Sequence, residues 1–220
     1  MPSALFDVVT RHLGQSDYHE TWQAMRRFTA ERTEESADEL WLLHHPAVYT
    51  LGQAGRREHL LDPGTTPVVE SDRGGQVSWH GPGQLVAYPL LDLRRWGLGV
   101  RNLVSALEQA VISLLAVYGI ASHRRATAPG VYVDGAKIAA LGLRVRRGCC
   151  YHGLALNVCN DLDPFARINP CGQPGLRTTR FYDHGPALHL DRLELELTVH
   201  LLEALDCAAS ANRSPAAAIC

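Results

Sequence analysis

The chain has 220 residues, in which 21 lysines and arginines stand against 23 aspartates and glutamates and leave a formal net charge of −2 at pH 7. This balance argues against a dedicated nucleic-acid-binding protein, which would carry a basic excess or a basic stripe. Hydrophobic residues make up 46% and charged residues 20% of the chain, the composition of an ordinary globular domain with a substantial core.

The two ends of the chain predict its compartment and its domain limits. Asp7 and Arg11 lie where a signal peptide would need its apolar segment, and no run reaches the ~20 apolar residues of a membrane span. The six cysteines form no disulfide framework. We therefore expect a cytoplasmic protein with a single catalytic domain over residues 1–208. Small and polar residues predict a disordered tail over 209–220.

Three helices are predicted from apolar residues that recur with the helical period. Asp17 and Glu20 form a capping pair at the start of the first, Gly119 ends the second, and Asp191 is the expected N-cap of the third. The three apolar faces consist, in turn, of Tyr18, Trp22, Met25 and Phe28; of Val100, Leu103, Val104, Leu107, Val111, Leu114, Leu115 and Tyr118; and of Leu193, Leu197, Leu201 and Leu205.

Short apolar runs predict strands over 40–43, 47–51, 77–79 and 85–91. The clearest hairpin joins residues 131–133 to a strand over 136–146 through Asp134-Gly135, because Asp-Gly favours a tight hairpin turn. A third strand over 151–158 returns after Arg147-Gly148. Since the strands are grouped rather than alternating strictly with helices, we predict an α+β fold in which helices flank a mixed, mostly antiparallel sheet.

Residues 73–84, RGGQVSWHGPGQ, form the first candidate site. The glycines leave backbone N–H groups open to close approach by a ligand. Arg73 is suited to bind a carboxylate or phosphate, and His80 to donate to a carbonyl oxygen. The spacing matches neither a Walker loop nor a dinucleotide fingerprint, so a plain turn is the alternative.

Lys137 is the one lysine in the chain. If its strand has no bulge, Lys137 shares a face with Ala139, Leu141, Leu143 and Val145 and points to the apolar side of the sheet. Burial lowers the pKa of a lysine, as a catalytic base requires. The alternative is a lysine that snorkels at a strand end.

Cys171 lies in Asn169-Pro170-Cys171-Gly172, where proline and glycine predict a shaped loop around the thiol. Cys159 and Cys207 are interpreted as buried, inert thiols. A metal site would have to combine Cys149, Cys150, His152 and Cys159, a spacing that matches no usual zinc pattern. We therefore expect no metal.

Several stretches of the chain together resemble one enzyme family. They read RGGQVSWHGPGQLVAYPLLDL at 73–93, GVYVDGAKIAALGLRVRRG at 130–148, YHGLALNV at 151–158 and DLDPFARINPCG at 161–172, and the similarity extends back through 40–56 to Tyr18. These motifs resemble the octanoyltransferases of lipoate biosynthesis, octanoyl-[acyl-carrier-protein]–protein N-octanoyltransferases. The resemblance implies the fold of the biotin and lipoate protein ligases.

The same resemblance implies site residues and an ATP-independent reaction without a cofactor. Cys171 would be the nucleophile, which carries the octanoyl group as a thioester, and Lys137 the general acid and base. The acyl-binding residues would be Arg73, Gly74, Gly75, Gln76, Val77, Ser78, Trp79, His80, Ala140, Leu141, Gly142, Gly153, Leu154 and Ala155. Trp79 departs from the family pattern and leaves the shape of the acyl pocket open.

The implied partners are octanoyl-acyl carrier protein as donor and, as acceptors, lipoyl domains of 2-oxoacid dehydrogenase subunits and the glycine cleavage carrier protein. We expect a monomer that binds neither nucleic acid nor membrane. The acidic carrier is expected to dock on exposed arginines between Arg144 and Arg147, so that the Michaelis constant depends on salt.

Three alternatives remain open from the sequence. One is an ATP-dependent lipoate or biotin ligase of the same fold, which would need no nucleophilic cysteine. Another is a cysteine hydrolase that pairs Cys171 with one of the eleven histidines. The third is a non-catalytic lipid- or thioester-binding module, whose binding would survive replacement of Cys171 by serine.

Overall fold

The computed structural model describes residues 7–126 and 128–213. Its strands are β1 (Val8–Gln15), β2 (Asp38–His44), β3 (Val48–Leu51), β4 (Val68–Glu70), β5 (Val77–His80), β6 (Gln84–Leu90), β7 (His123–Arg124), β8 (Gly130–Val133), β9 (Ala136–Arg146) and β10 (Cys149–Asn157). Its helices are α1 (Tyr18–Glu31), α2 (Leu93–Trp96), α3 (Val100–Val117), α4 (Asp163–Ala166) and α5 (Leu190–Arg213), with 3₁₀ turns η1 (Arg57–His59), η2 (Pro170–Gly172) and η3 (Phe181–Asp183).

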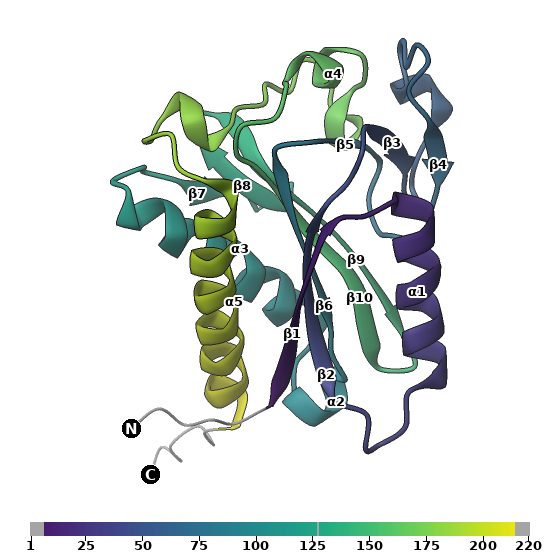
Figure 1. Cartoon of the computed structure of the whole chain (residues 1–220), viewed down its shortest axis with the longest axis vertical. Coiled ribbons are helices and arrows are strands. Elements are labelled where there is room, and N and C mark those ends of the chain that lie inside the picture. Colours follow the sequence, from purple (N-terminus) through teal and green to yellow (C-terminus); the bar gives the residue numbers. More distant parts are fainter. Residues whose placement is uncertain (1–6, 127, 214–220) are drawn as a thin grey trace.

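Seven strands form one sheet in the order β1-β2-β6-β10-β9-β8-β7, and β4-β3-β5 form a second, smaller sheet (Figure 1). In the large sheet β1 is parallel to β2, and every other neighbouring pair is antiparallel. The predicted mixed, mostly antiparallel sheet is therefore confirmed. Strands β1, β4 and β7 were not predicted, because β1 mixes polar residues into an exposed edge and the other two are very short.

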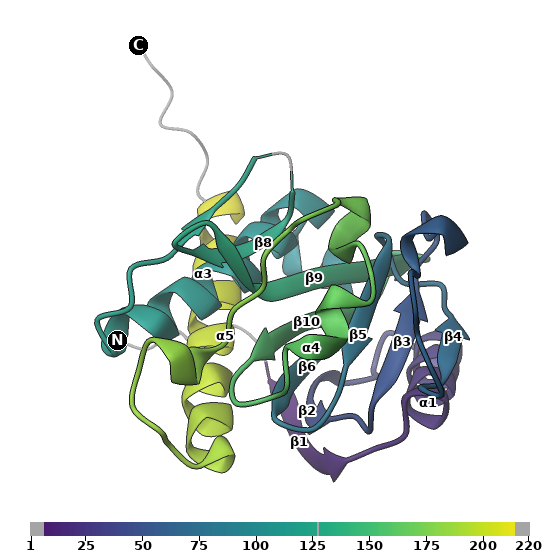
Figure 2. The same ribbon diagram turned by 90° about the horizontal axis from the view of Figure 1, so that it is seen from above.

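Helices cover both faces of the large sheet (Figures 1 and 2). On one face α3 and α5 pack together, and the predicted leucine stripe Leu193, Leu197, Leu201 and Leu205 is fully buried there. On the other face lie α1 and the smaller sheet, with Met25 buried against the strands. Within the described residues, α3 alone is long and apolar enough to suit a membrane span, and its buried residues pack as those of a core helix do.

The helix ends agree with the sequence in part. The Asp17 side chain accepts from the Glu20 N–H at 3.0 Å, and Gly119 follows α3 with φ +70°. However, α5 begins at Leu190, so Asp191 lies in its first turn and is not the N-cap. The predicted tail is also wrong over 209–213, because α5 continues to Arg213 and buries Ala209 in the core. The rest of that tail, 214–220, lies outside the described residues.

The hairpin between β8 and β9 contains a bulge that sequence reasoning did not foresee. Asp134 and Gly135 both have positive φ, as the predicted tight turn requires. Beyond the turn, Tyr132 pairs with Lys137 but Val131 pairs with Ala139, so Ile138 is an extra residue in β9. Ile138 and Ala139 both face the core beneath α3 and α5. The prediction that Lys137 shares the face of Ala139 is therefore wrong.

Candidate active site

The bulge turns Lys137 toward Cys171, which lies in the turn η2. Lys137 Nζ is 3.0 Å from Cys171 Sγ and 3.0 Å from the carbonyl oxygen of Pro129. The backbone of Lys137 is also bound to the segment that follows Cys171, since its N–H donates to Arg177 O at 2.8 Å and its carbonyl accepts from Thr179 N–H at 3.0 Å. One chain segment therefore fixes both members of the pair.

Cys171 itself has a left-handed backbone, with φ 57° and ψ 20°. This conformation costs a non-glycine residue about 1–2 kcal/mol, so the surrounding loop must impose it. The loop is tied down where Asn169 N–H donates to His59 O at 2.8 Å and Gly172 N–H to Asn169 O at 2.9 Å. The thiol is thereby presented at the head of a sharp turn and is partly exposed.

Aromatic and acidic groups complete the surroundings of Lys137, whose side chain is buried. Its Nζ lies 5.2 Å from the centre of the Tyr132 ring, over which Arg125 also stacks at 4.1 Å. Glu108 from α3 accepts from the Gly130 N–H at 2.8 Å and so anchors the neighbouring Pro129 carbonyl.

The balance of burial and charge decides the protonation of Lys137. Burial alone lowers its pKa, but the Cys171 thiol and then Tyr132 outweigh burial and raise the pKa above its ordinary value. The sequence alone leaves open whether Lys137 rests as an amine or as an ammonium group. Its raised pKa makes the resting lysine an ammonium group at neutral pH, 3.0 Å from the Cys171 sulfur.

A cavity of about 340 Å³ extends from the pair. It follows the β9–β10 ladder, where the cross-strand pairs Ala140–Ala155 and Gly142–Gly153 have the smallest side chains and leave a channel. The structure places these sequence-predicted residues on its wall: Arg73, Gly74, Gly75, Gln76, Val77, Ser78, His80, Lys137, Ala140, Leu141, Gly142, Gly153, Leu154, Ala155 and Cys171.

Trp79 is the predicted acyl-binding residue that does not line the cavity. Val77, Ser78 and His80 of β5 line the cavity, whereas Trp79 packs in an apolar cluster with Phe165 and Ile168. The Trp79 ring meets Phe165 of α4 edge-on at 5.5 Å. Trp79 therefore supports the loop that leads to Cys171, and its place in the acyl site is corrected.

Arg73 is buried, and its guanidinium is used inside the protein. It donates to Thr50 Oγ1 at 3.0 Å and to the carbonyl oxygens of Gly74, Thr50 and Gln76 at 2.9, 2.7 and 2.7 Å. The predicted role as a carboxylate or phosphate ligand is not supported by this arrangement. Arg73 instead holds the glycine-rich loop in its shape.

Sequence reasoning missed other cavity residues, among them Val100 and Val104 of α3, Tyr88 and His152. His152 has φ 57° within β10, and the register on either side places it opposite Pro89, which has no N–H for the ladder. Its Nε2 lies 3.0 Å from Asp72 Oδ1. A proline inside a predicted strand was the available signal for this irregularity.

Asp72 collects three donors beside the cavity, from His152, Tyr151 and Trp22. Burial alone would raise the pKa of Asp72, but these hydrogen bonds outweigh it and hold the pKa well below its usual range. Asp72 is therefore ionised at neutral pH.

The cysteines other than Cys171 offer no metal centre in the part of the chain that the structure describes. No group of three or more His, Cys, Asp or Glu residues there is placed to hold an ion. Burial raises the pKa of Cys150 to about 12, so that this thiol stays protonated.

Comparison with known proteins gives three findings. The family "Lipoyl protein ligase A/B catalytic domain" matches residues 17–186. An octanoyltransferase of Halorhodospira halophila is 70% identical over 97% of this chain and 98% of its own length, and one of Alkalilimnicola ehrlichii is 67% identical over 93% and 95%.

Solved structures share the fold at low identity. The bipartite lipoate protein ligase of Thermoplasma acidophilum superposes with a TM-score of 0.73 at 15% identity, over 91% of this chain and 84% of that one. The biotin protein ligase of Aquifex aeolicus gives 0.58 at 13% identity, over 92% and 72%. The fold predicted from the resemblance is thereby confirmed.

Proposed function

Because the chain belongs to the octanoyltransferases, within the lipoyl protein ligase A/B catalytic-domain family, we propose that it transfers octanoyl from a carrier-bound thioester to a lysine amine through an octanoyl-thioester on Cys171. The 3.0 Å contact between Lys137 Nζ and Cys171 Sγ carries this proposal, since it joins a nucleophile to a proton carrier at the mouth of a channel.

In the first step the Cys171 sulfur attacks the thioester carbonyl of octanoyl-acyl carrier protein. A new C–S bond to Cys171 forms, the C–S bond to the carrier's thiol breaks, and Lys137 gives its proton to that leaving thiolate. Because the donor is already a thioester, the exchange is nearly balanced in energy and needs no ATP.

In the second step a lysine amine of a lipoyl domain attacks the octanoyl-Cys171 thioester. A free lysine has a pKa of ~10.4 and arrives almost wholly protonated at pH 7, so the step needs a base. Lys137, now a neutral amine, takes one proton from the incoming ammonium group, and the attacking nitrogen loses a second proton to water as the C–N bond becomes an amide. The C–S bond to Cys171 breaks, and the pair returns to ammonium and thiolate.

Proton handling is the main contribution that this pair can make. Lowering a thiol pKa by ~2 units raises its thiolate fraction strongly, but the lower nucleophilicity removes most of the gain and leaves roughly a factor of 3. General acid–base help is typically worth ~10²–10⁴-fold. A lysine can cycle its proton in this way, whereas an arginine holds its proton throughout.

The proposed partners are octanoyl-acyl carrier protein and the lipoyl domains of 2-oxoacid dehydrogenases and of the glycine cleavage carrier. Arg146 and Arg147 are exposed at the turn between β9 and β10, where an acidic carrier could be steered. Arg144 donates to Gln53 Oε1 at 2.6 Å and is therefore less available to bind an acidic carrier.

Intact-protein mass spectrometry after mixing with octanoyl-acyl carrier protein tests the proposal. We expect a mass gain of one octanoyl group without ATP, which persists in Cys159→Ala and disappears in Cys171→Ala. Addition of a lipoyl domain should then move the label to that domain. A label retained in Cys171→Ala, strict dependence on ATP, or release of mainly free octanoate would each contradict the proposal.

A further inference from the structure

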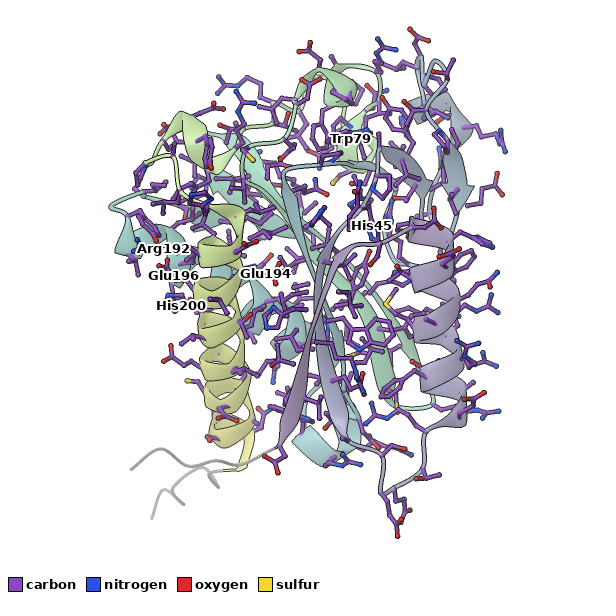
Figure 3. The ribbon with its side chains drawn as sticks, viewed as in Figure 1. His45, Trp79, Arg192, Glu194, Glu196 and His200 are labelled. Atoms are coloured by element: carbon purple, nitrogen blue, oxygen red, sulfur yellow. The ribbon has the colours of Figure 1, made fainter. Side chains whose placement is uncertain are left out.

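The inner part of the cavity contains polar rings that the proposed chemistry does not use. His80 and Tyr88 line the cavity, and His45 lies behind them with ring centres 5.8 and 5.9 Å away. The Tyr88 ring meets His152 edge-on at 5.9 Å. Figure 3 shows His45 between the large sheet and the end of α1. These four residues, His45, His80, Tyr88 and His152, form the ring cluster.

The ring cluster lies away from the thiol. His152 pairs with Leu143, which lies further along β9 than Ala140 and Gly142, the residues that line the channel beyond Lys137. A smaller cavity that touches both Cys171 and Lys137 is lined by Ala140 and Ala155 but by no member of the ring cluster. An acyl chain on Cys171 that follows the channel therefore brings its far end toward these rings.

Hydrogen bonds fix where the proton of His80 lies. The carbonyl oxygen of Thr179 can only accept, so Asn157 Nδ2 donates to it at 3.0 Å. Asn157 Oδ1 then accepts from Gln84 Nε2 at 2.9 Å, and Gln84 Oε1 accepts from His80 Nδ1 at 2.7 Å. Burial, followed by the nearby charges of His45 and Arg73, lowers the pKa of His80 well below its ordinary value. Neutral His80 thus carries its proton on Nδ1.

Tyr88 is oriented by the same kind of anchor. The carbonyl oxygen of Ser16 accepts from His45 Nδ1 at 2.7 Å, which leaves His45 Nε2 without a proton. Tyr88 O–H therefore donates to His45 Nε2 at 2.8 Å. Like His80, Tyr88 donates its hydrogen bond to a group outside the cavity and keeps lone pairs that can accept one.

The consequence is an inner wall that presents acceptors. His80 is buried, and within residues 7–126 and 128–213 its Nε2 has no hydrogen-bond partner. His80 uses its Nδ1–H to donate to the amide carbonyl oxygen of Gln84, so the nitrogen that remains is an acceptor. Unpaired acceptors gain nothing from a terminal methyl group but bind a hydroxyl hydrogen.

We propose that this enzyme also accepts medium-chain acyl thioesters that carry a hydroxyl at the far end of the chain, with His80 Nε2 as the hydroxyl's acceptor. The inference rests on the proposed function, because it places the acyl chain in the same channel. The hydroxyl takes no part in bond changes: Cys171 displaces the donor thiol, and the target amine then displaces Cys171, as with octanoyl.

The test compares octanoyl and 8-hydroxyoctanoyl thioesters of pantetheine by the rate of acyl-Cys171 formation. An apolar channel would disfavour the unpaired hydroxyl by roughly 5- to 150-fold. We expect the wild-type protein to acylate with the two thioesters at kcat/KM values within about 5-fold. His80→Phe should lower the ratio of kcat/KM for 8-hydroxyoctanoyl to kcat/KM for octanoyl by about 10-fold or more.

Tyr49→Phe is the matched control, because Tyr49 is a buried phenol outside the channel that donates to Pro164 O at 3.0 Å. In Tyr49→Phe the kcat/KM for 8-hydroxyoctanoyl, divided by that for octanoyl, should equal the wild-type value. If His80→Phe fails to fold, His80→Leu, which also lacks an acceptor, gives the same comparison of the two thioesters.

Two outcomes would overturn the inference alone: rejection of 8-hydroxyoctanoyl by more than about 100-fold while octanoyl acylates Cys171 normally, or an unchanged ratio in folded His80 variants. Failure of octanoyl itself to acylate Cys171 would overturn the proposed function.

Discussion

At the scale of single residues, the site depends on two side chains held in costly states. Lys137 is buried as an ammonium group, and Cys171 has a left-handed backbone that suits glycine better. Each is stabilised by the other and by backbone groups, Pro129 O for the lysine and the Asn169 turn for the cysteine. The pair is therefore preorganised before substrate arrives.

Lys137→Arg should reduce octanoyl transfer by at least ~10²-fold although it keeps the positive charge. Arginine cannot release its proton and so cannot pass one between the two steps. Single-turnover transfer to a lipoyl domain measures the effect. Arg125→Lys, a charge-preserving exchange over the same Tyr132 ring, is the control and should lose less than about 5-fold. A Lys137→Arg rate near that of wild type would contradict the proton-carrying role.

Sequence reasoning at this scale identified the two residues but not their surroundings. The family motifs identify Lys137 and Cys171. Strand alternation predicts that Lys137 points to the apolar side of the sheet, but a one-residue bulge at Ile138 turns its side chain to the opposite face. The direction of the His80 proton depends on Gln84, Asn157 and Thr179, which lie far apart in sequence. Such a chain of donors has no local signature.

At the scale of secondary-structure elements, β10 organises the channel and the catalytic loop together. The small residues of β10 leave room for the channel. Its last residue, Asn157, accepts a hydrogen bond from Gln84 of β6 and donates one to Thr179 O in the segment that follows Cys171. Thr179 in turn donates its N–H to Lys137 O. Asn157 is thus a positioning residue for both Lys137 and the loop of Cys171, the pair of the proposed mechanism.

Asn157→Asp removes the donor to Thr179 O and adds a buried carboxyl group of the same shape. We expect a loss of about 2–3 kcal/mol in the free energy of unfolding and a drop in kcat of ~10-fold or more with KM for the acyl donor little changed. Urea denaturation and steady-state kinetics measure the two effects.

The control for Asn157→Asp is Asn160→Asp, because Asn160 is equally buried but donates to Asp161 O outside the site. Its stability should also fall, while its pH profile of Cys171 alkylation stays that of wild type. Asn157→Asp should shift that profile. Equal profiles in the two variants would assign Asn157 a purely structural role.

At the scale of the whole molecule, periodicity and turn chemistry predicted the layers well. The leucine stripe of α5, the α3 helix and the β8–β9–β10 meander were all readable because their apolar spacing is regular. The edge strand β1 was not, since its pairing to β2 is parallel and depends on α1 bringing the chain back. The predicted domain limit at residue 208 is too early. The alanine and polar residues near 209 become helical only because α5 packs against the core.

The buried histidines make the stability of the whole fold sensitive to acid. Burial lowers the pKa of His45 from near 6.5 to about 4 and, in the same direction, those of His80 and His152. Between these two values the unfolded chain binds more protons than the folded one, so the free energy of unfolding falls as pH falls.

His45→Gln should remove part of that dependence. The difference in unfolding free energy between pH 7 and pH 5 should shrink by about 2 kcal/mol, because one histidine no longer contributes. Urea denaturation at the two pH values measures it, with His44→Gln, a partly exposed neighbour, as the control. A difference as large as that of wild type would show that His45 is protonated in the folded protein.

The place of α5 in the chain has a consequence for biosynthesis. The residues of α5 that cover one face of the sheet, from Leu193 to Ala209, come after both Lys137 and Cys171 in the chain. A growing chain therefore has its nucleophile and its channel strands long before that apolar face can be covered. Until α5 has been synthesised, the leucine, valine and isoleucine side chains that it covers stay exposed.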